Sequence, residues 1–187
     1  MIFSFSACRN KKENQNNEVI NSTTIAETEP EKIKKNKTIK LELPLNLIDE
    51  KYRDDLDAYC EANGFISAKL NKKSQTVTIK MKSFSHELLL SNIGLSVIKE
   101  INSVASSKKY ASVKKIKSID TDNFDKVTIS VDKNKYKKEG DIGAYVIGQS
   151  CLLYQLYSGA KDCSCSVVVT DNKTGKTIET KTYTNKD

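Results

Sequence analysis

The chain has 187 residues, which is enough for one domain with a hydrophobic core and an additional arm, and too short for two ordinary domains. Its net charge is +7, and residues 1–37 hold 7 basic and 5 acidic side chains, which leaves +5 for the remainder. This excess favours polyanions such as nucleic acid, anionic lipid or a cell-wall polymer without specifying one. Five cysteines without a Cys-x-x-Cys pair, and a single histidine, exclude the usual structural zinc sites, so we expect no metal or other cofactor.

The chain divides by composition near residue 37. Residues 9–37 are dominated by Asn, Glu, Lys, Thr and Ser and have almost no apolar periodicity, so they are predicted to form a disordered polar linker. From Thr38 onward, Ile, Leu and Val recur at regular intervals with turn residues between them. We therefore predict a single folded domain over residues 38–187.

The first half of this domain is predicted to contain a strand, a helix, a hairpin and a second helix. Apolar and polar residues alternate over 39–43, and a helical apolar face runs from a cap at Asn46 to a stop at Asn63-Gly64. Alternation returns at 66–70 and 77–81, which predicts a hairpin. A second helix follows from Ser83 or Ser85 to about Ala105.

The second half repeats this order. Strands are predicted over 113–119 and 127–131, followed by a helix at 142–157 that is apolar on nearly all sides and is ended by Gly159. A last hairpin pairs 163–170 with 176–183 around the turn at 171–175. The order is one strand followed by three helix-strand-strand units. It predicts an α+β fold with an antiparallel sheet and three helices on one face.

The N-terminus carries a short motif, Phe5-Ser6-Ala7-Cys8, followed by basic and polar residues. The motif resembles the lipobox of bacterial lipoproteins of the Gram-positive type, in which small residues precede a cysteine that receives a diacylglycerol. The resemblance implies lipid attachment at Cys8, with residues 1–8 as the remnant of an export signal, and an anchor on the extracytoplasmic face of the membrane. The segment from Tyr136 to the Thr174-Gly175 turn also resembles small, uncharacterised lipoproteins of Gram-positive bacteria, which implies location only.

Two interpretations of Cys8 remain open. A working export signal has a basic start and an apolar stretch of about 7 to 15 residues, and only four residues precede the motif here. On the lipoprotein interpretation, translation therefore begins upstream of Met1. On the alternative interpretation, the match is accidental and Cys8 is an ordinary thiol in the polar segment.

Candidate catalytic side chains have simpler structural interpretations. His86 is the only imidazole and is expected at the surface beside a helix start, and Cys151 is expected in the core because it lies well inside an apolar helix. Cys163 and Cys165 are expected to be buried thiols on one side of a strand. A disulfide from either of them to Cys60 or Cys151 remains open in an exported protein. We expect no enzymatic activity.

One surface feature is compatible with ligand binding. If the hairpins share a sheet, several lysines alternate with inward apolar residues and project from its open face: Lys40, Lys69, Lys80, Lys82, Lys115 and Lys117. They either keep the sheet soluble or form a polyanion-binding site. We therefore expect a lipid-anchored surface protein that binds a protein, a peptide or an anionic wall polymer. The alternative is a cytoplasmic basic nucleic-acid-binding module, which the absence of Trp makes weaker.

Overall fold

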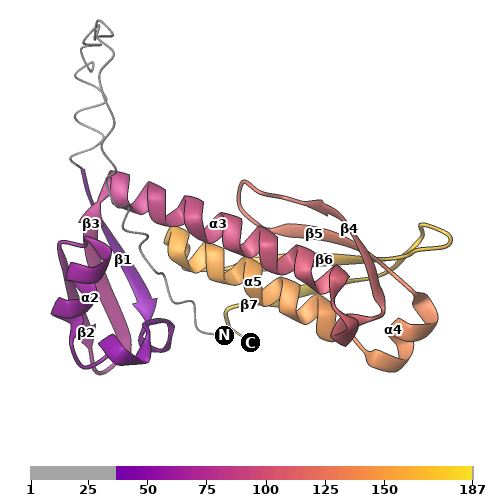
Figure 1. Ribbon diagram of the computed structural model, residues 1–187, viewed down its shortest axis with the longest axis horizontal. Helices are drawn as coiled ribbons and strands as arrows, with labels where there is room; N and C mark the ends of the chain where they lie inside the picture. Colours follow the sequence, from indigo (N-terminus) through magenta and orange to yellow (C-terminus); the bar gives the residue numbers. More distant parts are fainter. Residues whose placement is uncertain (1–36, 187) are drawn as a thin grey trace, which may run out of the picture. The chain divides into compact units, whose positions relative to one another are not determined.

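The computed structural model describes residues 37–186, in which four α-helices and two β-sheets confirm the predicted α+β class (Figure 1). Cys8 and almost all of the predicted linker lie outside the described residues. The fold divides into two compact units, unit 1 up to Ser85 and unit 2 from His86. Each unit is described by itself.

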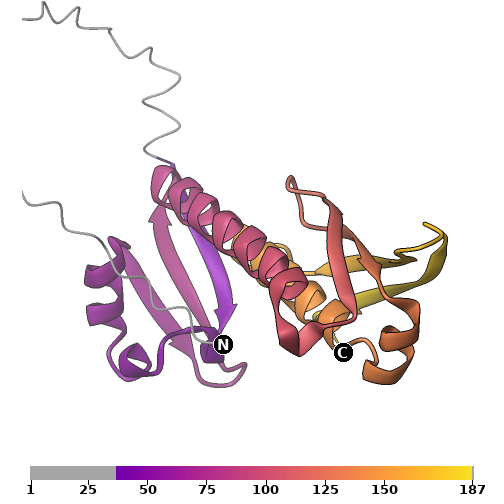
Figure 2. The same cartoon turned by 45° about the vertical axis from the view of Figure 1, so that its right-hand side comes forward.

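Unit 1 is a three-stranded antiparallel sheet in the order β1-β3-β2, with β1 at Thr38–Pro44, β3 at Thr76–Lys82 and β2 at Ser67–Asn71. The three strands and their pairing agree with the sequence prediction. Alternate side chains on one side of the sheet are buried, among them Leu41, Val77 and Ile79. Helix α2 (Leu56–Asn63) packs against the sheet beside β2 (Figure 2).

The predicted helix over 46–63 is wrong in its first half. The chain forms two short 3-10 turns, η1 (Leu45–Leu47) and η2 (Glu50–Tyr52), and α2 begins only at Leu56. Two aspartates cap these short elements: Asp49 caps η2 and Asp55 caps α2. Asp49 accepts a hydrogen bond from the Lys51 amide, and Asp55 accepts one of 2.9 Å from the Ala58 amide. Asp favours such caps over helix interiors because its short side chain reaches nearby backbone amides.

Unit 2 contains a four-stranded sheet in the order β4-β5-β6-β7, with β4 at Val113–Ile119, β5 at Lys126–Val131, β6 at Ser164–Asp171 and β7 at Thr177–Thr184. Two hairpins, β4-β5 and β6-β7, are antiparallel as predicted, but β5 and β6 pair in parallel. A parallel pair needs a long crossover, and residues 132–163 supply one. The crossover also contains a fourth helix, α4 (Lys133–Glu139), which was not predicted.

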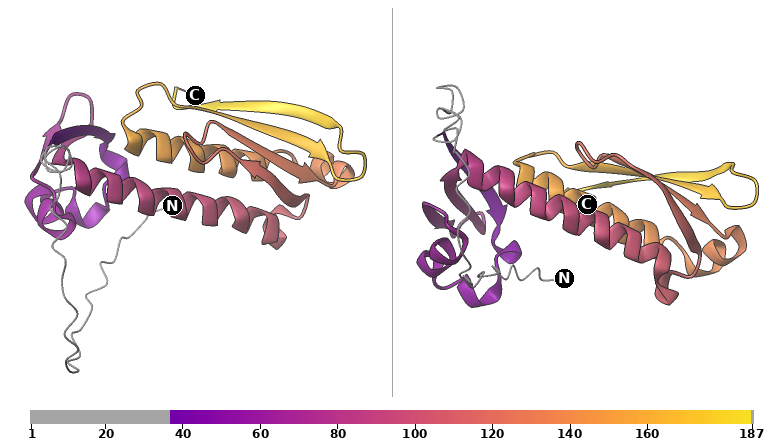
Figure 3. Two further views of the ribbon diagram at one scale, coloured as in Figure 1. Left: turned by 90° about the horizontal axis from the view of Figure 1, so that it is seen from above. Right: turned by 45° about the horizontal axis from the view of Figure 1, so that its top comes forward.

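The two long helices of unit 2 were predicted correctly. Helix α3 (Ser83–Ser106) begins in unit 1 and continues through unit 2, where it runs beside α5 (Ile142–Ser158) (Figures 1 and 3). Ile93, Val97 and Ile101 of α3 are buried, and α5 packs on β6 and β7. Helix α3 is also long and apolar enough to span a membrane. This is weak evidence for a membrane span, because the core helices of soluble proteins can meet the same criteria.

Helix α5 approaches its neighbours closely at two glycines. A Cβ on Gly143 would lie 2.8 Å from Val113 Cγ2, and a Cβ on Gly148 would lie 2.6 Å from Tyr183 Cγ. Real Cβ atoms are not found at such separations, so these positions require glycine unless a neighbour moves. The missing side chains let α5 approach β4 at one position and β7 at the other.

Candidate functional site

Four of the six predicted lysines share the open face of the unit 1 sheet. Strand pairing places Lys80 of β3 directly opposite Lys40 of β1, and Lys82 and Lys69 project from the same side. All four are exposed, and within the described chain none of them forms an ion pair. Glu42 is the one acid on this side, and it accepts a hydrogen bond of 2.7 Å from Thr76. We call these four lysines the basic face.

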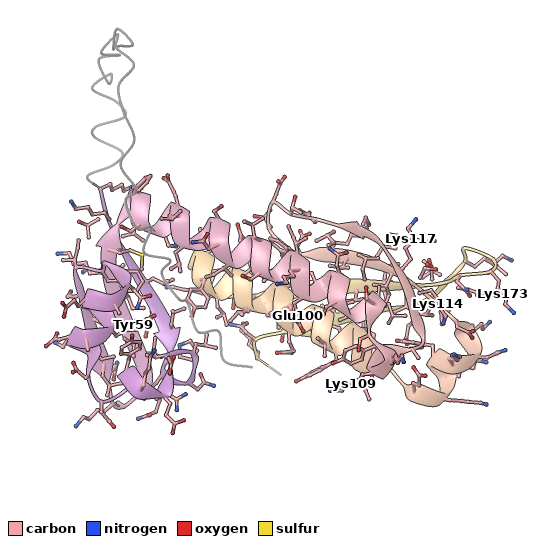
Figure 4. All side chains as sticks on the ribbon, in the orientation of Figure 1. Tyr59, Glu100, Lys109, Lys114, Lys117 and Lys173 are labelled. Carbon is pink, nitrogen blue, oxygen red and sulfur yellow. The ribbon has the colours of Figure 1, made fainter. Side chains whose placement is uncertain are left out.

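Lys115 and Lys117 do not belong to the basic face. Both lie on β4 in the other sheet, so the hairpins do not share one sheet, which was the condition for all six lysines to project from a common face. The register of β4 shifts at two places, and Lys114 and Lys117 fall at these shifts. Both side chains are exposed (Figure 4), and that of Lys114 donates a hydrogen bond of 2.9 Å to the Ala111 carbonyl. Because β4 is an edge strand, irregular pairing and exposed lysines there discourage a further strand from adding to the sheet.

His86 is buried, which corrects the expectation of a surface histidine. Its Nε2 lies 2.9 Å from the backbone oxygen of Tyr157 near the end of α5. A carbonyl oxygen only accepts, so Nε2 carries the proton in this bond. The imidazole thus satisfies one of the unpaired carbonyl groups at the C-terminus of α5. The only imidazole in the chain therefore has a structural role in this conformation.

The four described cysteines are buried, as expected for Cys151, Cys163 and Cys165, and no disulfide joins any two of them in this structure. Burial raises the pKa of the Cys60 thiol, and the nearby carboxylate of Asp57 raises it further. Burial is also the main cause of the raised pKa of Cys163. Thiols with raised pKa values hold little thiolate, which is the nucleophilic form.

A polar cluster that sequence reasoning missed lies on the helix-facing side of β7. Glu179, Lys181 and Tyr183 occupy alternate positions there, opposite the buried side chains of β6. Glu179 accepts a hydrogen bond of 2.5 Å from Tyr136 of α4, and Lys181 pairs with Asp141 at the start of α5. The alternation of Glu179, Lys181 and Tyr183 along the strand is the sequence pattern that could have indicated this cluster. The cluster joins the middle of α4 and the start of α5 to the edge strand β7.

The environment of this cluster shifts the ionisation of its members. Burial raises the pKa of Tyr136, and the hydrogen bond to Glu179 raises it further. The ammonium group of Lys181 lowers the pKa of the Asp141 carboxyl, and that carboxylate raises the pKa of Lys181. Tyr183 has a raised pKa because it is desolvated and lies near two carboxylates. At neutral pH, Asp141 and Lys181 are therefore charged, and Tyr136 and Tyr183 are neutral, which suits a structural role.

Comparison with known protein families, with curated proteins and with solved structures finds no match. Over residues 37–186, no group of three or more His, Cys, Asp or Glu side chains is placed to hold a metal ion. The candidate site therefore depends on the geometry of the basic face.

We expect two tyrosine substitutions in the β7 cluster to have opposite effects on stability. Among the described residues, the Tyr183 hydroxyl is buried without a hydrogen-bond partner, so Tyr183→Phe should leave the free energy of unfolding unchanged or raise it by up to about 1 kcal/mol. Tyr136→Phe removes a hydrogen bond to a carboxylate and should lower that free energy by about 1–3 kcal/mol. Urea denaturation of the two variants and wild type measures both values. Equal losses for the two variants would contradict this difference in hydrogen bonding.

Proposed function

We propose that this chain is a lipid-anchored extracytoplasmic protein whose non-catalytic domain binds an anionic cell-wall polymer through the basic face. The Cys8 motif and the polar segment 9–37 support the anchor and the linker. A diacylglycerol buries acyl carbons at about 0.8 kcal/mol per CH₂, which is sufficient to hold a protein on a membrane.

The observation that carries the binding proposal is the direct pairing of Lys40 and Lys80. Residues opposite each other in an antiparallel sheet have Cβ atoms about 5 Å apart, and like charges at this distance destabilise the pair. Lys80 lies on the central strand β3, so protection of a sheet edge does not account for it. A bound anion between the two ammonium groups would remove their repulsion.

The composition of this face favours a phosphate-bearing polymer over nucleic acid. The lysines share this side of the sheet with the hydroxyls of Thr38 and Thr78, and hydroxyls of this kind donate hydrogen bonds to phosphate oxygens. Lysine contacts phosphate as a flexible point charge and does not require a fixed ligand geometry. No aromatic side chain is present on this side of the three described strands, whereas sheets that bind single strands use aromatic rings to stack bases.

The binding proposal predicts unequal effects of two matched double substitutions. Lys40→Gln with Lys80→Gln should weaken binding to inorganic polyphosphate about tenfold or more, and should reduce the slope of log K against log salt by roughly 0.7 for each lysine. Lys115→Gln with Lys117→Gln changes the net charge equally but removes lysines from the edge strand β4, so it should have a much smaller effect. Calorimetric titration at several salt concentrations measures both.

Equal losses for the two pairs would show that binding depends on net charge and would overturn the site. Tighter binding of a single-stranded oligonucleotide than of polyphosphate, with the same dependence on Lys40 and Lys80, would favour the nucleic-acid-binding alternative.

The anchor is tested by the partition of the protein between membrane and soluble fractions. Expressed with its natural upstream sequence, the wild-type chain should be found in the membrane fraction, and Cys8→Ser should move it to the soluble fraction because the acylated sulfur is lost. Lys11→Gln, which retains the cysteine, serves as the control. An unchanged partition of Cys8→Ser would refute lipid anchoring.

A further inference from the structure

Two of the buried thiols in unit 2 are in contact. Cys151 lies in the middle of α5 and Cys165 lies near the start of β6, and both residues are 0% exposed. The two thiols lie close enough for each to affect the ionisation of the other. The chain between them turns back at Gly159, which ends α5 with a left-handed backbone at φ 91°. The pair therefore joins a helix to the sheet strand that follows it.

Contacts one helical turn before and one turn after Cys151 fix its position against β6. On one side, Gln155 accepts a hydrogen bond of 2.8 Å from the Ser164 amide and donates one of 2.9 Å to the Ser164 carbonyl, directly before Cys165. On the other side, Gly148 lies against the ring of Tyr183, which is the cross-strand partner of Cys165. The two sulfur atoms are thus held together by contacts that do not involve sulfur.

Cys163 differs from this pair although it is only two residues from Cys165. Its thiol donates to the backbone oxygen of Ala160 over 3.5 Å, within the turn after α5. Cys60 is a residue of helix α2 and belongs to unit 1. Of the four described cysteines, only Cys151 and Cys165 have each other as neighbours.

We propose that Cys151 and Cys165 form a disulfide that ties α5 to β6 when the chain folds in an oxidising compartment. The proposal rests on the extracytoplasmic location given above for the oxidising conditions. The bond forms by exchange with a small-molecule or protein disulfide. The two thiols together lose two protons and two electrons, an S–S bond forms between them, and the donor disulfide is reduced to two thiols.

The environment of the pair determines when the bond forms. The interaction with Cys165, followed by burial, raises the pKa of Cys151, and exchange requires an exposed thiolate. The folded, reduced protein should therefore resist oxidation, whereas the chain should be oxidised readily while it is still folding. Once formed, the buried bond should be equally protected from reductants.

The experiment uses the full chain with Cys8→Ser, unfolded in reductant and then refolded in excess oxidised glutathione. Free thiols are blocked with N-ethylmaleimide in denaturant, and the digest is analysed by mass spectrometry. We expect one peptide pair linked through Cys151 and Cys165, with Cys60 and Cys163 blocked. Reduction should lower the melting temperature by on the order of 10 °C. The matched variant Cys163→Ala should retain the linked pair and the same response to reductant.

Blocked thiols at both Cys151 and Cys165 after refolding would overturn the pairing, whatever the result of the Cys8 partition test. A link from Cys165 to Cys163 or Cys60 would overturn it as well. If the link forms on refolding but protein isolated from cells carries two free thiols, the proposed compartment is wrong. Oxidation of the folded protein as fast as that of the refolding chain would contradict the protection of the pair by burial.

Discussion

The contact of α5 with β6 and β7 is the interaction on which unit 2 depends. Because β6 runs parallel to β5, the chain must cross over the sheet between them, and α5 is the main element of this crossover. The crossover is held at one end by Gly148, where the absence of a Cβ admits the ring of Tyr183. It is held at the other end by Gln155, whose amide binds the backbone of Ser164 and also donates to the carbonyl of Phe124 over 3.1 Å. His86 from α3 then binds the last turn of α5.

The two units have different characters, and the difference bears on function. Unit 2 uses several of its polar side chains to join its own elements, as in the Tyr136–Glu179 and Lys181–Asp141 pairs between α4, α5 and β7. Unit 1 has an apolar side facing its own core and a basic side facing solvent. The lysines of the basic face repel one another across the strands and have no carboxylate partner among the described residues. This unsatisfied charge is what makes unit 1 the candidate binding unit.

Local periodicity in the sequence was sufficient for the strands, the three hairpins, α3 and α5, because burial on one side leaves an alternating or helical pattern of apolar residues. Three features had no such pattern. The parallel pairing of β5 with β6 depends on contacts between distant segments, and the lysine-rich α4 has too short an apolar face to be recognised. The start of α2 was misplaced because Asp49 caps a 3-10 turn and Asp55 caps the start of α2, so the helix does not extend back to Asn46. The division of the lysines between two sheets, and the burial of His86 against Tyr157, likewise depend on tertiary structure.

The free energy of unfolding of Gly148→Ala tests the central contact most directly, with Gly94→Ala as the matched control. Both glycines lie inside helices, where alanine is favoured by up to about 1 kcal/mol. A Cβ on Gly94 would lie 3.4 Å from the Tyr154 ring, an ordinary contact, so this variant should be as stable as wild type or more stable. A Cβ on Gly148 would collide with the Tyr183 ring, so we expect a loss of about 1–3 kcal/mol. Equal or higher stability of Gly148→Ala would show that α5 does not pack on β7 in this way, and the account of unit 2 would have to be abandoned.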